Sequence, residues 1–266
     1  MHSDLELIVK EFPADYDCLR VYALGDIHVG SEQFDEESTK KIVDYIYNDP
    51  FACVVLCGDL ADLGLKNSKT NIYNATMSIR EQLDYVYKLF LPIADKITAC
   101  VGGNHELRIT KEVGTCPLYD LCVRWDCPEV YRENLAITKY SFGLIEGQKK
   151  RNTFIGITTH GSTRNKHRKF TMTVEGADFS ISGHVHDPSY SPRGKLRVNS
   201  RYNIAKHVPF KEIVVDAHLK PGGYALKNEY EIAPPVELQY FELSSYRETK
   251  SSRNIHKVID YHAMQL

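Results

Sequence analysis

The sequence predicts an α/β protein, in which a parallel sheet is followed by a strand-rich half. From residue 19 to residue 101, apolar strand-like runs alternate with amphipathic helices. This alternation is typical of parallel strands joined by right-handed crossovers. After residue 135, strand-like runs follow one another with few long helices between them. No linker rich in Pro, Gly and Ser separates the halves. We therefore expect one domain over residues 1–243 and a polar tail over residues 244–266.

Apolar spacing and turn residues define the individual elements. Asp35 is the expected N-cap of a helix that reaches Tyr47, and a longer helix carries one apolar stripe and ends near Pro92. That stripe consists of Ile79, Leu83, Val86 and Phe90. The expected strands cover residues 19–24, 51–57, 97–101, 136–145, 153–159, 179–182, 196–204, 211–219 and 237–243. In the tail, Ile255, Val258 and Ile259 indicate a short docking helix.

Composition excludes several classes of protein. With 266 residues, 42% hydrophobic and 26% charged, the chain is neither collagen-like, coiled-coil nor disordered. The net charge of −2 identifies no partner. Residues 161–211, however, hold 10 Lys and Arg against 3 Asp and Glu, which indicates an anion-binding face. No basic and apolar leader opens the sequence, and its longest plainly apolar run, residues 52–57, is too short for a membrane span.

The seven cysteines favour a reducing compartment, and we expect a cytoplasmic protein. Three of them lie in apolar strand-like runs, where a thiol behaves as a small hydrophobe. Cys116, Cys122 and Cys127 are separated by five and four residues, which is not the paired spacing of a zinc ribbon. We therefore do not expect a structural zinc site there.

Five short segments combine glycine with aspartate, histidine or asparagine, and each follows a predicted strand. They are Gly25-Asp26-Ile27-His28, Gly58-Asp59-Leu60-Ala61-Asp62, Gly103-Asn104-His105-Glu106, Thr159-His160-Gly161 and Gly183-His184-Val185-His186. The carboxyl ends of strands in an open α/β sheet line the ligand crevice, so we expect these side chains to meet. Each motif taken alone is weak, and the ordered series carries the prediction.

The donor types predict a dinuclear metal site. A set of carboxylate, imidazole and amide donors suits Mn, Fe or Zn better than Mg or Ca, which prefer oxygen alone. Seven candidate ligands are too many for one ion, and they suit two ions when one aspartate bridges. Two such ions activate water and neutralise charge on a phosphate ester. We expect Mn first, with Fe, Zn or Ni as alternatives.

These five motifs, in this order, resemble the calcineurin-like metallophosphoesterase superfamily. The resemblance runs from Asp26 to His186 and implies a four-layer α/β/β/α sandwich of two mixed sheets flanked by helices. It implies that Asp59 bridges two metals and that His105 contacts the phosphate and protonates the leaving oxygen. The other implied ligands are Asp26, His28 and His186 for the first metal, and Asn104, His160 and His184 for the second.

Three further residues near the motifs have open roles. Asp62 and Glu106 are expected either to orient a ligand or His105 through hydrogen bonds, or to be ordinary packing or solvated residues. The Ser/Thr protein phosphatase branch carries Asp-Arg-Gly after its second motif, where this sequence has Asp62-Leu63-Gly64. Arg108 lies close in sequence and is the candidate to replace the missing phosphate-binding arginine.

The expected activity is hydrolysis of phosphate esters by a metal-activated hydroxide, and three readings remain open. The first is a phosphodiesterase or nuclease that acts on nucleic acid or nucleotides and broadly resembles the exonuclease branch. The second is a phosphomonoesterase, including a protein phosphatase. The third is a catalytically silent scaffold of the same fold. The first is favoured by basic residues that follow His160 and could hold a polyanion. They are Arg164, Lys166 and Arg168. The oligomeric state is not predicted.

Overall fold

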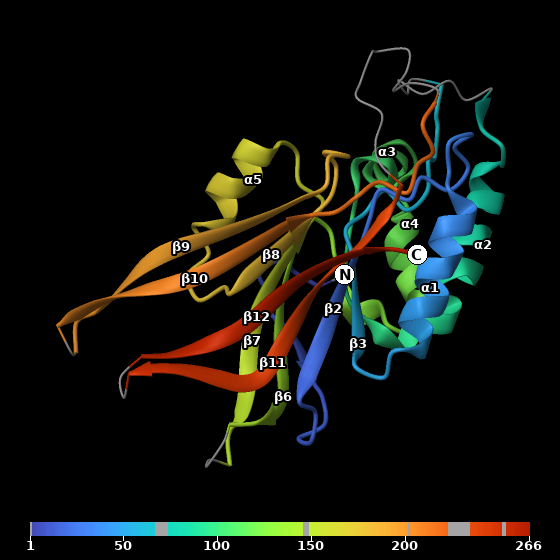
Figure 1. Ribbon diagram of the computed structural model, residues 1–266. Helices are drawn as coiled ribbons and strands as arrows, with labels where there is room; N and C mark the ends of the chain where they lie inside the picture. The colour runs from blue at the N-terminus through green and yellow to red at the C-terminus, as the bar shows by residue number, and fades with distance from the viewer. Residues whose placement is uncertain (1, 67–73, 146–148, 202, 223–234, 252–253) are drawn as a thin grey trace.

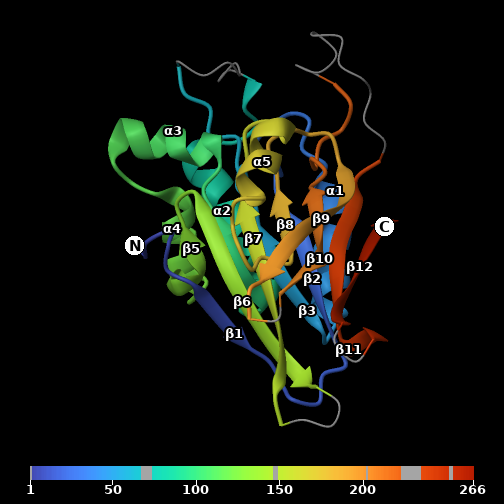
Figure 2. The same ribbon diagram turned by 90° about the vertical axis from the view of Figure 1, so that its left-hand side faces the viewer.

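Two six-stranded mixed sheets lie face to face between helices (Figures 1 and 2). This computed structural model describes residues 2–66, 74–145, 149–201, 203–222, 235–251 and 254–266. Sheet 1 has the strand order β12-β11-β2-β3-β4-β5, and sheet 2 has the order β1-β6-β7-β8-β10-β9. The arrangement confirms the expected α/β class with two mixed sheets flanked by helices.

Sheet 1 contains the predicted parallel half of the chain. Strands β2, β3, β4 and β5 are parallel, and β11 and β12 add an antiparallel pair beside β2. Their bounds are β2 Cys18–Leu24, β3 Ala52–Leu56, β4 Ile97–Val101, β5 Tyr131–Arg132, β11 Glu237–Ser251 and β12 Asn254–Gln265. The crossover helices are α1 Glu36–Asn48, α2 Ile79–Phe90 with the 3-10 turn η2 Leu91–Lys96, α3 Asn104–Val113, and α4 Pro117–Arg124 with η3 Pro128–Val130.

The start of α1 and the end of α2 lie where the sequence predicts. The Asp35 side chain accepts a hydrogen bond from the Ser38 backbone N–H, so it caps α1. Ser78 and Glu81 form a reciprocal capping box at the start of α2. At the other end of α2, Pro92 falls in the 3-10 turn η2, which confirms that the α-helix stops near that proline.

Sheet 2 contains the strand-rich half. Strands β7, β8 and β10 are parallel, β6 is antiparallel to β7, and β9 is antiparallel to β10. The bounds are β1 Ile8–Glu11, β6 Leu135–Leu144, β7 Arg151–Thr159, β8 Phe179–Ser182, β9 Ser189–Asn199 and β10 Ile204–Val214. Helix α5, Arg164–Thr171, lies over the outer face of β7 and β8 (Figure 2).

The main cores lie on the two faces of sheet 1. One core fills the space between the sheets, where residues such as Val21, Val55 and Phe179 are fully or almost fully buried. The other packs α1, α2 and α4 on the opposite face of sheet 1, around residues such as Val54 and Ile46. A β-strand buried on both faces reads as a continuous apolar run, which is why β2, β3 and β4 could be located from sequence.

The C-terminal segment corrects one prediction. The sequence pattern of Ile255, Val258 and Ile259 suggested a short helix, but Asn254–Gln265 forms strand β12. Within that strand, Ile259 and Tyr261 pack on the core between the sheets, whereas Asp260 between them is exposed. Alternation with period two therefore governs this segment, and the pairing partner β11 extends well past the predicted end at residue 243.

Strands β9 and β10 are also displaced from prediction. We expected strands at 196–204 and 211–219, but β9 and β10 pair antiparallel, with Asn199 opposite Ile204. The prediction treated the apolar residues Leu196 and Val198 as part of a buried strand, but they are 78% and 74% exposed. The sequence analysis did not predict β1, α3, α4 or α5. Among the residues that the structure describes, no helix is both long and apolar enough to cross a membrane.

Candidate metal centre

The loops that follow β2, β3, β4, β7 and β8 meet at one end of the two sheets. Backbone hydrogen bonds tie the first two loops together, because Asp26 N–H donates to Gly58 O and His28 N–H donates to Asp59 O, both at 3.0 Å. In sheet 2, Gly183 N–H donates to His160 O at 3.1 Å. The parallel order of the strands therefore delivers all five sequence motifs to one place.

Asp26, His28 and His186 form the first cluster of donor atoms. The Nε2 atoms of His28 and His186 lie 3.2 Å apart, and His186 Nε2 lies 3.2 Å from Asp26 Oδ1. Asp26 and His28 are buried, while the His186 side chain is 38% exposed. One donor atom from each residue lies within 4.8 Å of the others, which is close enough to surround a single ion.

The second cluster contains Asp59, Asn104, His160 and His184. Asn104 Oδ1 lies 2.9 Å from His160 Nε2 and 2.7 Å from His184 Nδ1. The two ring nitrogens are 3.1 Å apart, and His160 Nε2 lies 3.3 Å from Asp59 Oδ2. The other ring nitrogen of His160 donates to the carbonyl of Cys57 at 2.7 Å, which fixes the ring so that Nε2 faces the cluster.

Asp59 and His105 lie between the two clusters. Asp59 belongs to the group with His160 and His184 and also to a group with His28 and His105. Asp59 and His28 therefore connect the second cluster to the first. His105 Nε2 lies 3.8 Å from Asp59 Oδ2. Its Nδ1 hydrogen donates to the Asp62 carbonyl at 2.5 Å, which directs Nε2 toward Asp59. All seven sequence-predicted ligands and His105 are thus brought together.

The backbone at these loops is strained. Five of the clustered residues have a left-handed conformation, which non-glycine residues rarely adopt: Asp26, His28, Asp59, His184 and His186 have φ between 50° and 71°. Such conformations cost roughly 1–3 kcal/mol each and concentrate at functional sites. The surrounding hydrogen bonds maintain this strained backbone, and as a result the side chains point toward the clusters.

Close backbone approach explains why glycines accompany the motifs. A Cβ on Gly103 would collide with the backbone N and the carboxylate of Asp59. A Cβ on Gly183 would lie 2.5 Å from Asp26 Oδ2. Only a residue without a side chain fits at either position.

Glu106 holds the loop that carries Asp59. Its buried carboxylate accepts hydrogen bonds from the backbone N–H groups of Asp59 at 2.9 Å, Leu60 at 2.8 Å and Gly103 at 3.1 Å. Burial, followed by the nearby charge of Asp59, raises the pKa of Glu106 to about 7. Of the two readings left open for Glu106, these contacts favour the supporting one.

Asp62 and Arg108 lie beside His105. Asp62 Oδ1 is 3.5 Å from His105 Nδ1 and 4.0 Å from His28 Nδ1, so its carboxylate faces both rings. Burial raises the pKa of Asp62, and the charges of His105 and Arg108 oppose that rise. One guanidinium nitrogen of Arg108, Nη1, is buried without a hydrogen-bond partner.

The pKa shifts test whether these residues fit metal ions. Burial and then the charge of His105 lower the pKa of His28 to about 3, so its imidazole is neutral and carries a free lone pair. Burial opposes the charge on His160, but its hydrogen bond and charge interaction with Asp59 raise its pKa to about 9. A proton therefore occupies the position where a cation would neutralise Asp59, and metal binding would displace it. The mixed nitrogen and oxygen donors fit Mn, Fe or Zn.

The three basic residues predicted to bind substrate have different surroundings in the structure. Lys166 is exposed and lines a pocket beside the second cluster. Arg168 instead turns toward sheet 2, where its Nε lies 3.3 Å from Glu212 Oε1 and its Nη2 lies 3.3 Å from Ser191 Oγ. Arg164 is the first residue of α5. Arg168 therefore binds residues of sheet 2, and the expectation that it contacts substrate is not supported.

Two residues next to the site were missed by sequence reasoning. The backbone N–H of His218 donates to Asp26 O at 3.0 Å, and its ring Nδ1 lies 2.9 Å from Thr39 Oγ1. Burial raises the pKa of Asp216 to about 6, although hydrogen bonds from the backbone N–H groups of Glu237 and Ala217 oppose that rise. Both residues follow β10, which ends at Val214. A sequence analysis that ended the strand there would have identified them as candidate site residues. Cys116, Cys122 and Cys127 are buried free thiols, outside every metal-capable group found in the described part of the chain.

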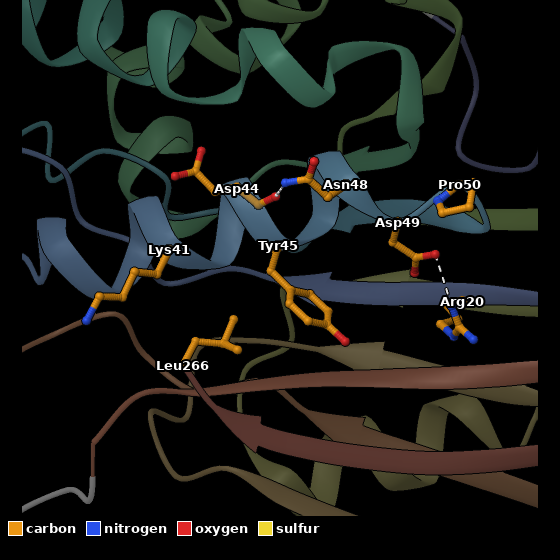
Figure 3. Close-up of a pocket in the computed structure, with 8 residues that line it drawn as sticks. All are labelled: Arg20, Lys41, Asp44, Tyr45, Asn48, Asp49, Pro50 and Leu266. Carbon is orange, nitrogen blue, oxygen red and sulfur yellow. Dashed lines mark hydrogen bonds and ion pairs between the residues drawn. The ribbon is translucent and has the colours of Figure 1, made fainter.

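Two pockets are prominent on the described surface. The pocket beside the second cluster has a volume of about 350 Å³ and includes Asn104 and His160 in its wall. A larger one, of about 640 Å³, lies between α1 and the C-terminal end of β12 (Figure 3). In that pocket, Arg20 is already paired with Asp49 at 2.9 Å (Figure 3), and no predicted site residue lines it. The smaller pocket is therefore the one that adjoins the candidate metal centre.

Comparison with known proteins agrees with the fold and the motifs. The family model described as calcineurin-like phosphoesterase matches residues 19–188, which is more than half of the chain. The protein therefore belongs to the calcineurin-like phosphoesterase family. No curated protein matches the sequence.

Two solved structures resemble the fold at low identity. The Vps29 structure from Chaetomium thermophilum is 6% identical, with a TM-score of 0.38, and the match covers 94% of this chain and 98% of that one. The NAD nucleotidase NadN from Haemophilus influenzae is 10% identical, with a TM-score of 0.45. That match covers 93% of this chain and half of NadN. Neither TM-score reaches 0.5, so the family assignment rests on the sequence match.

Proposed function

We propose that this protein is a dinuclear metal-dependent phosphodiesterase. The single observation that carries the proposal is the convergence of seven donor residues in two adjacent clusters, with Asp59 of the second cluster also grouped with His28 of the first. The seven are Asp26, His28, Asp59, Asn104, His160, His184 and His186. Membership of the calcineurin-like phosphoesterase family supports a reaction at a phosphate ester. Two divalent cations, when bound, supply positive charge that activates water and stabilises the phosphoryl group during displacement.

The chain's own residues divide the work of holding the ions. Asp26, His28 and His186 would hold one ion, and Asn104, His160 and His184 would hold the other. Asp59 would touch both. The Glu106 carboxylate accepts a hydrogen bond from the backbone N–H of Asp59 and so keeps Asp59 in place. The mixed donors favour Mn²⁺, with Fe, Zn or Ni as alternatives.

His105 is the proposed proton donor to the leaving oxygen. Its Nδ1 hydrogen is used by the Asp62 carbonyl, so Nε2 is the atom free to carry a proton toward substrate. Its ring centroid lies 4.6 Å from that of His28, at the edge of the first cluster. An imidazole so placed is suited to general acid catalysis. The Asp62 carboxylate, facing the same ring, orients it.

A diester is favoured over a monoester for two reasons. The position after Asp62 is Leu63, so the phosphate-binding arginine of the protein phosphatase branch is absent from the second motif. Bidentate contacts from arginine to phosphate are not easily replaced. In addition, the 350 Å³ pocket beside Asn104 gives room for a second organic group on the phosphorus.

An assay of the Mn-loaded protein on four substrates tests the proposal. We expect turnover of a simple phosphodiester well above that of a simple phosphomonoester, and loss of turnover with a chelator. Single- and double-stranded DNA are assayed in parallel, and activity that falls steeply with salt would identify a nuclease. Turnover of the monoester alone would replace the proposal with a phosphatase. Full metal loading without any turnover would indicate a scaffold.

Two variants separate metal binding from proton transfer. Asp59→Asn is expected to lose both bound metal and activity, because it removes the shared carboxylate. His105→Ala is expected to keep both metals and to lose roughly 10²–10⁴-fold in kcat, the usual contribution of a general acid. The measurements are metal content by elemental analysis and steady-state kinetics. Loss of metal from the His105 variant would assign His105 to the ligands instead, and unchanged turnover would remove it from the mechanism.

A further inference from the structure

The pocket beside the second cluster has an apolar lining next to polar donors. Leu107, Leu135 and Phe170 contribute apolar surface, and Lys166 contributes a positive charge. None of the described residues that line it is acidic. Its volume of about 350 Å³ lies within the range of small-ligand pockets, roughly 300–1,000 Å³. Such a lining suits a flat organic group that is joined to an anion.

Helix α5 forms one wall of this pocket and is fixed firmly to sheet 2. His167 Nδ1 lies 3.1 Å from Thr159 Oγ1, and Arg168 binds Glu212. Lys195 Nζ donates to the carbonyl of Thr171 at 3.2 Å, which closes the C-terminal end of the helix. These contacts leave little freedom for α5 to shift, so the residues on its pocket face are held in position.

Lys166 and Phe170 share that pocket face. They are four residues apart in α5, so their side chains lie one above the other on the helix. The Phe170 ring is 43% exposed although it is large and apolar, and it lines the pocket. An exposed ring beside an ammonium group is the arrangement that binds a base by stacking and its phosphate by charge.

The pocket lies on the side of the centre that holds Asn104 and His160. His105, the proposed donor to the leaving oxygen, is grouped instead with His28 and Asp59 and does not line the pocket. In an in-line displacement the leaving oxygen lies opposite the attacking water, and the group retained on phosphorus projects to the side of that line. Because His105 does not line the pocket, the pocket suits the retained group rather than the leaving group.

We propose that the protein acts on nucleoside phosphodiesters, and that the pocket holds the base of the retained nucleoside by stacking on Phe170 while Lys166 binds the phosphate. This inference rests on the proposed phosphodiesterase function and adds the substrate class. It makes Phe170 and Lys166 specificity residues on α5, in the same pocket wall as the proposed metal ligands Asn104 and His160.

A matched pair of diesters tests the proposal. Thymidine 5′-(p-nitrophenyl) phosphate and methyl p-nitrophenyl phosphate release the same product and differ only in the retained group. We expect Phe170→Ala to raise KM for the thymidine substrate about tenfold, the loss of one stacking contact, and to change the methyl substrate less than twofold. Neither kcat should change, and Phe170→Tyr should restore KM. An equal effect on both substrates, or none on the thymidine substrate, overturns the proposal.

A lysine comparison and a binding experiment complete the test. Lys166→Ala should weaken binding of thymidine 5′-monophosphate, whereas Lys169→Ala, a neighbour on α5 that does not line the pocket, should not. Calorimetry of the Mn-loaded variants with this nucleotide needs no turnover, so it also tests the pocket if no diester is hydrolysed. In that case the proposed function fails, and the pocket stands only if Phe170→Ala weakens nucleotide binding about tenfold. Unchanged binding in that variant overturns the pocket as well.

Discussion

Single residues at this site act through the backbone as much as through their side chains. Asp59 is in a left-handed conformation, and Glu106 accepts four hydrogen bonds from the backbone N–H groups around it. The residues that could be named from sequence are those that carry donor atoms. The sequence left the role of Glu106 open between two readings, because that role depends on a contact between helix α3 and the loop after β3, 47 positions away.

Gly103→Ala tests this close packing. The added Cβ would collide with Asp59, so we expect a loss of roughly 1–3 kcal/mol in the free energy of unfolding and a clear loss of metal affinity. Thermal unfolding and calorimetric Mn titration measure the two effects. Gly114→Ala is the control, since an added Cβ there has nothing within 4 Å. Because Gly114, unlike Gly103, has a positive φ, the two variants are compared by Mn affinity. If both variants bound Mn equally well, the packing argument would be wrong.

At the scale of elements, strands with buried faces were predicted well and the position of exposed ones was not. Strands β4 and β8 have the predicted bounds, because their side chains are buried on both faces. The β9–β10 hairpin was displaced because its apolar residues Leu196 and Val198 face solvent. The same displacement hid His218 and Asp216, which follow β10. Helix α5 was missed because its contacts with sheet 2 are polar.

The attachment of α5 predicts a stability change with pH. Burial, and then the charges of Arg193 and Arg168, lower the pKa of His167 to about 4, and Glu212 Oε2 faces its ring at 3.9 Å. An unfolded histidine has a pKa of about 6.5, so below that pH the unfolded state binds more protons. The free energy of unfolding should therefore fall as pH drops from about 6.5 to 4, by up to roughly 1.4 kcal/mol per pH unit.

His167→Gln should flatten that part of the profile relative to wild type, as measured by urea unfolding at several pH values. His207→Gln, which removes an exposed histidine from β10, is the control and should leave the profile unchanged. Superimposable profiles for wild type and the His167 variant would show that His167 does not contribute to acid sensitivity.

Strand β12 joins the two sheets through an aromatic pair. Tyr261 of β12 stacks on Tyr190 of β9, with ring centroids 4.3 Å apart and planes at 2°, where the two hairpins run side by side (Figure 1). Tyr261→Ala should lower the free energy of unfolding by about 2–3 kcal/mol, from lost burial and lost stacking. Tyr261→Phe keeps the ring and should cost less than about 1 kcal/mol. Chemical denaturation compares them, and an alanine variant as stable as wild type would contradict this role.

At the scale of the molecule, the site exists because two sheets end at the same place. Sheet 1 supplies Asp26, His28 and Asp59, and sheet 2 supplies His160, His184 and His186. The order of motifs along the chain was sufficient to predict that these residues meet. The proposed substrate pocket could not be predicted, because one of its walls is α5, which is held there by its attachment to sheet 2.

Anomalous diffraction from crystals grown with Mn²⁺ tests the central claim most directly. The account predicts two anomalous peaks roughly 3.5–4 Å apart. One should be in contact with Asp26, His28 and His186 and the other with Asn104, His160 and His184, with Asp59 touching both. A single peak, or two peaks of which Asp59 touches neither, would contradict it.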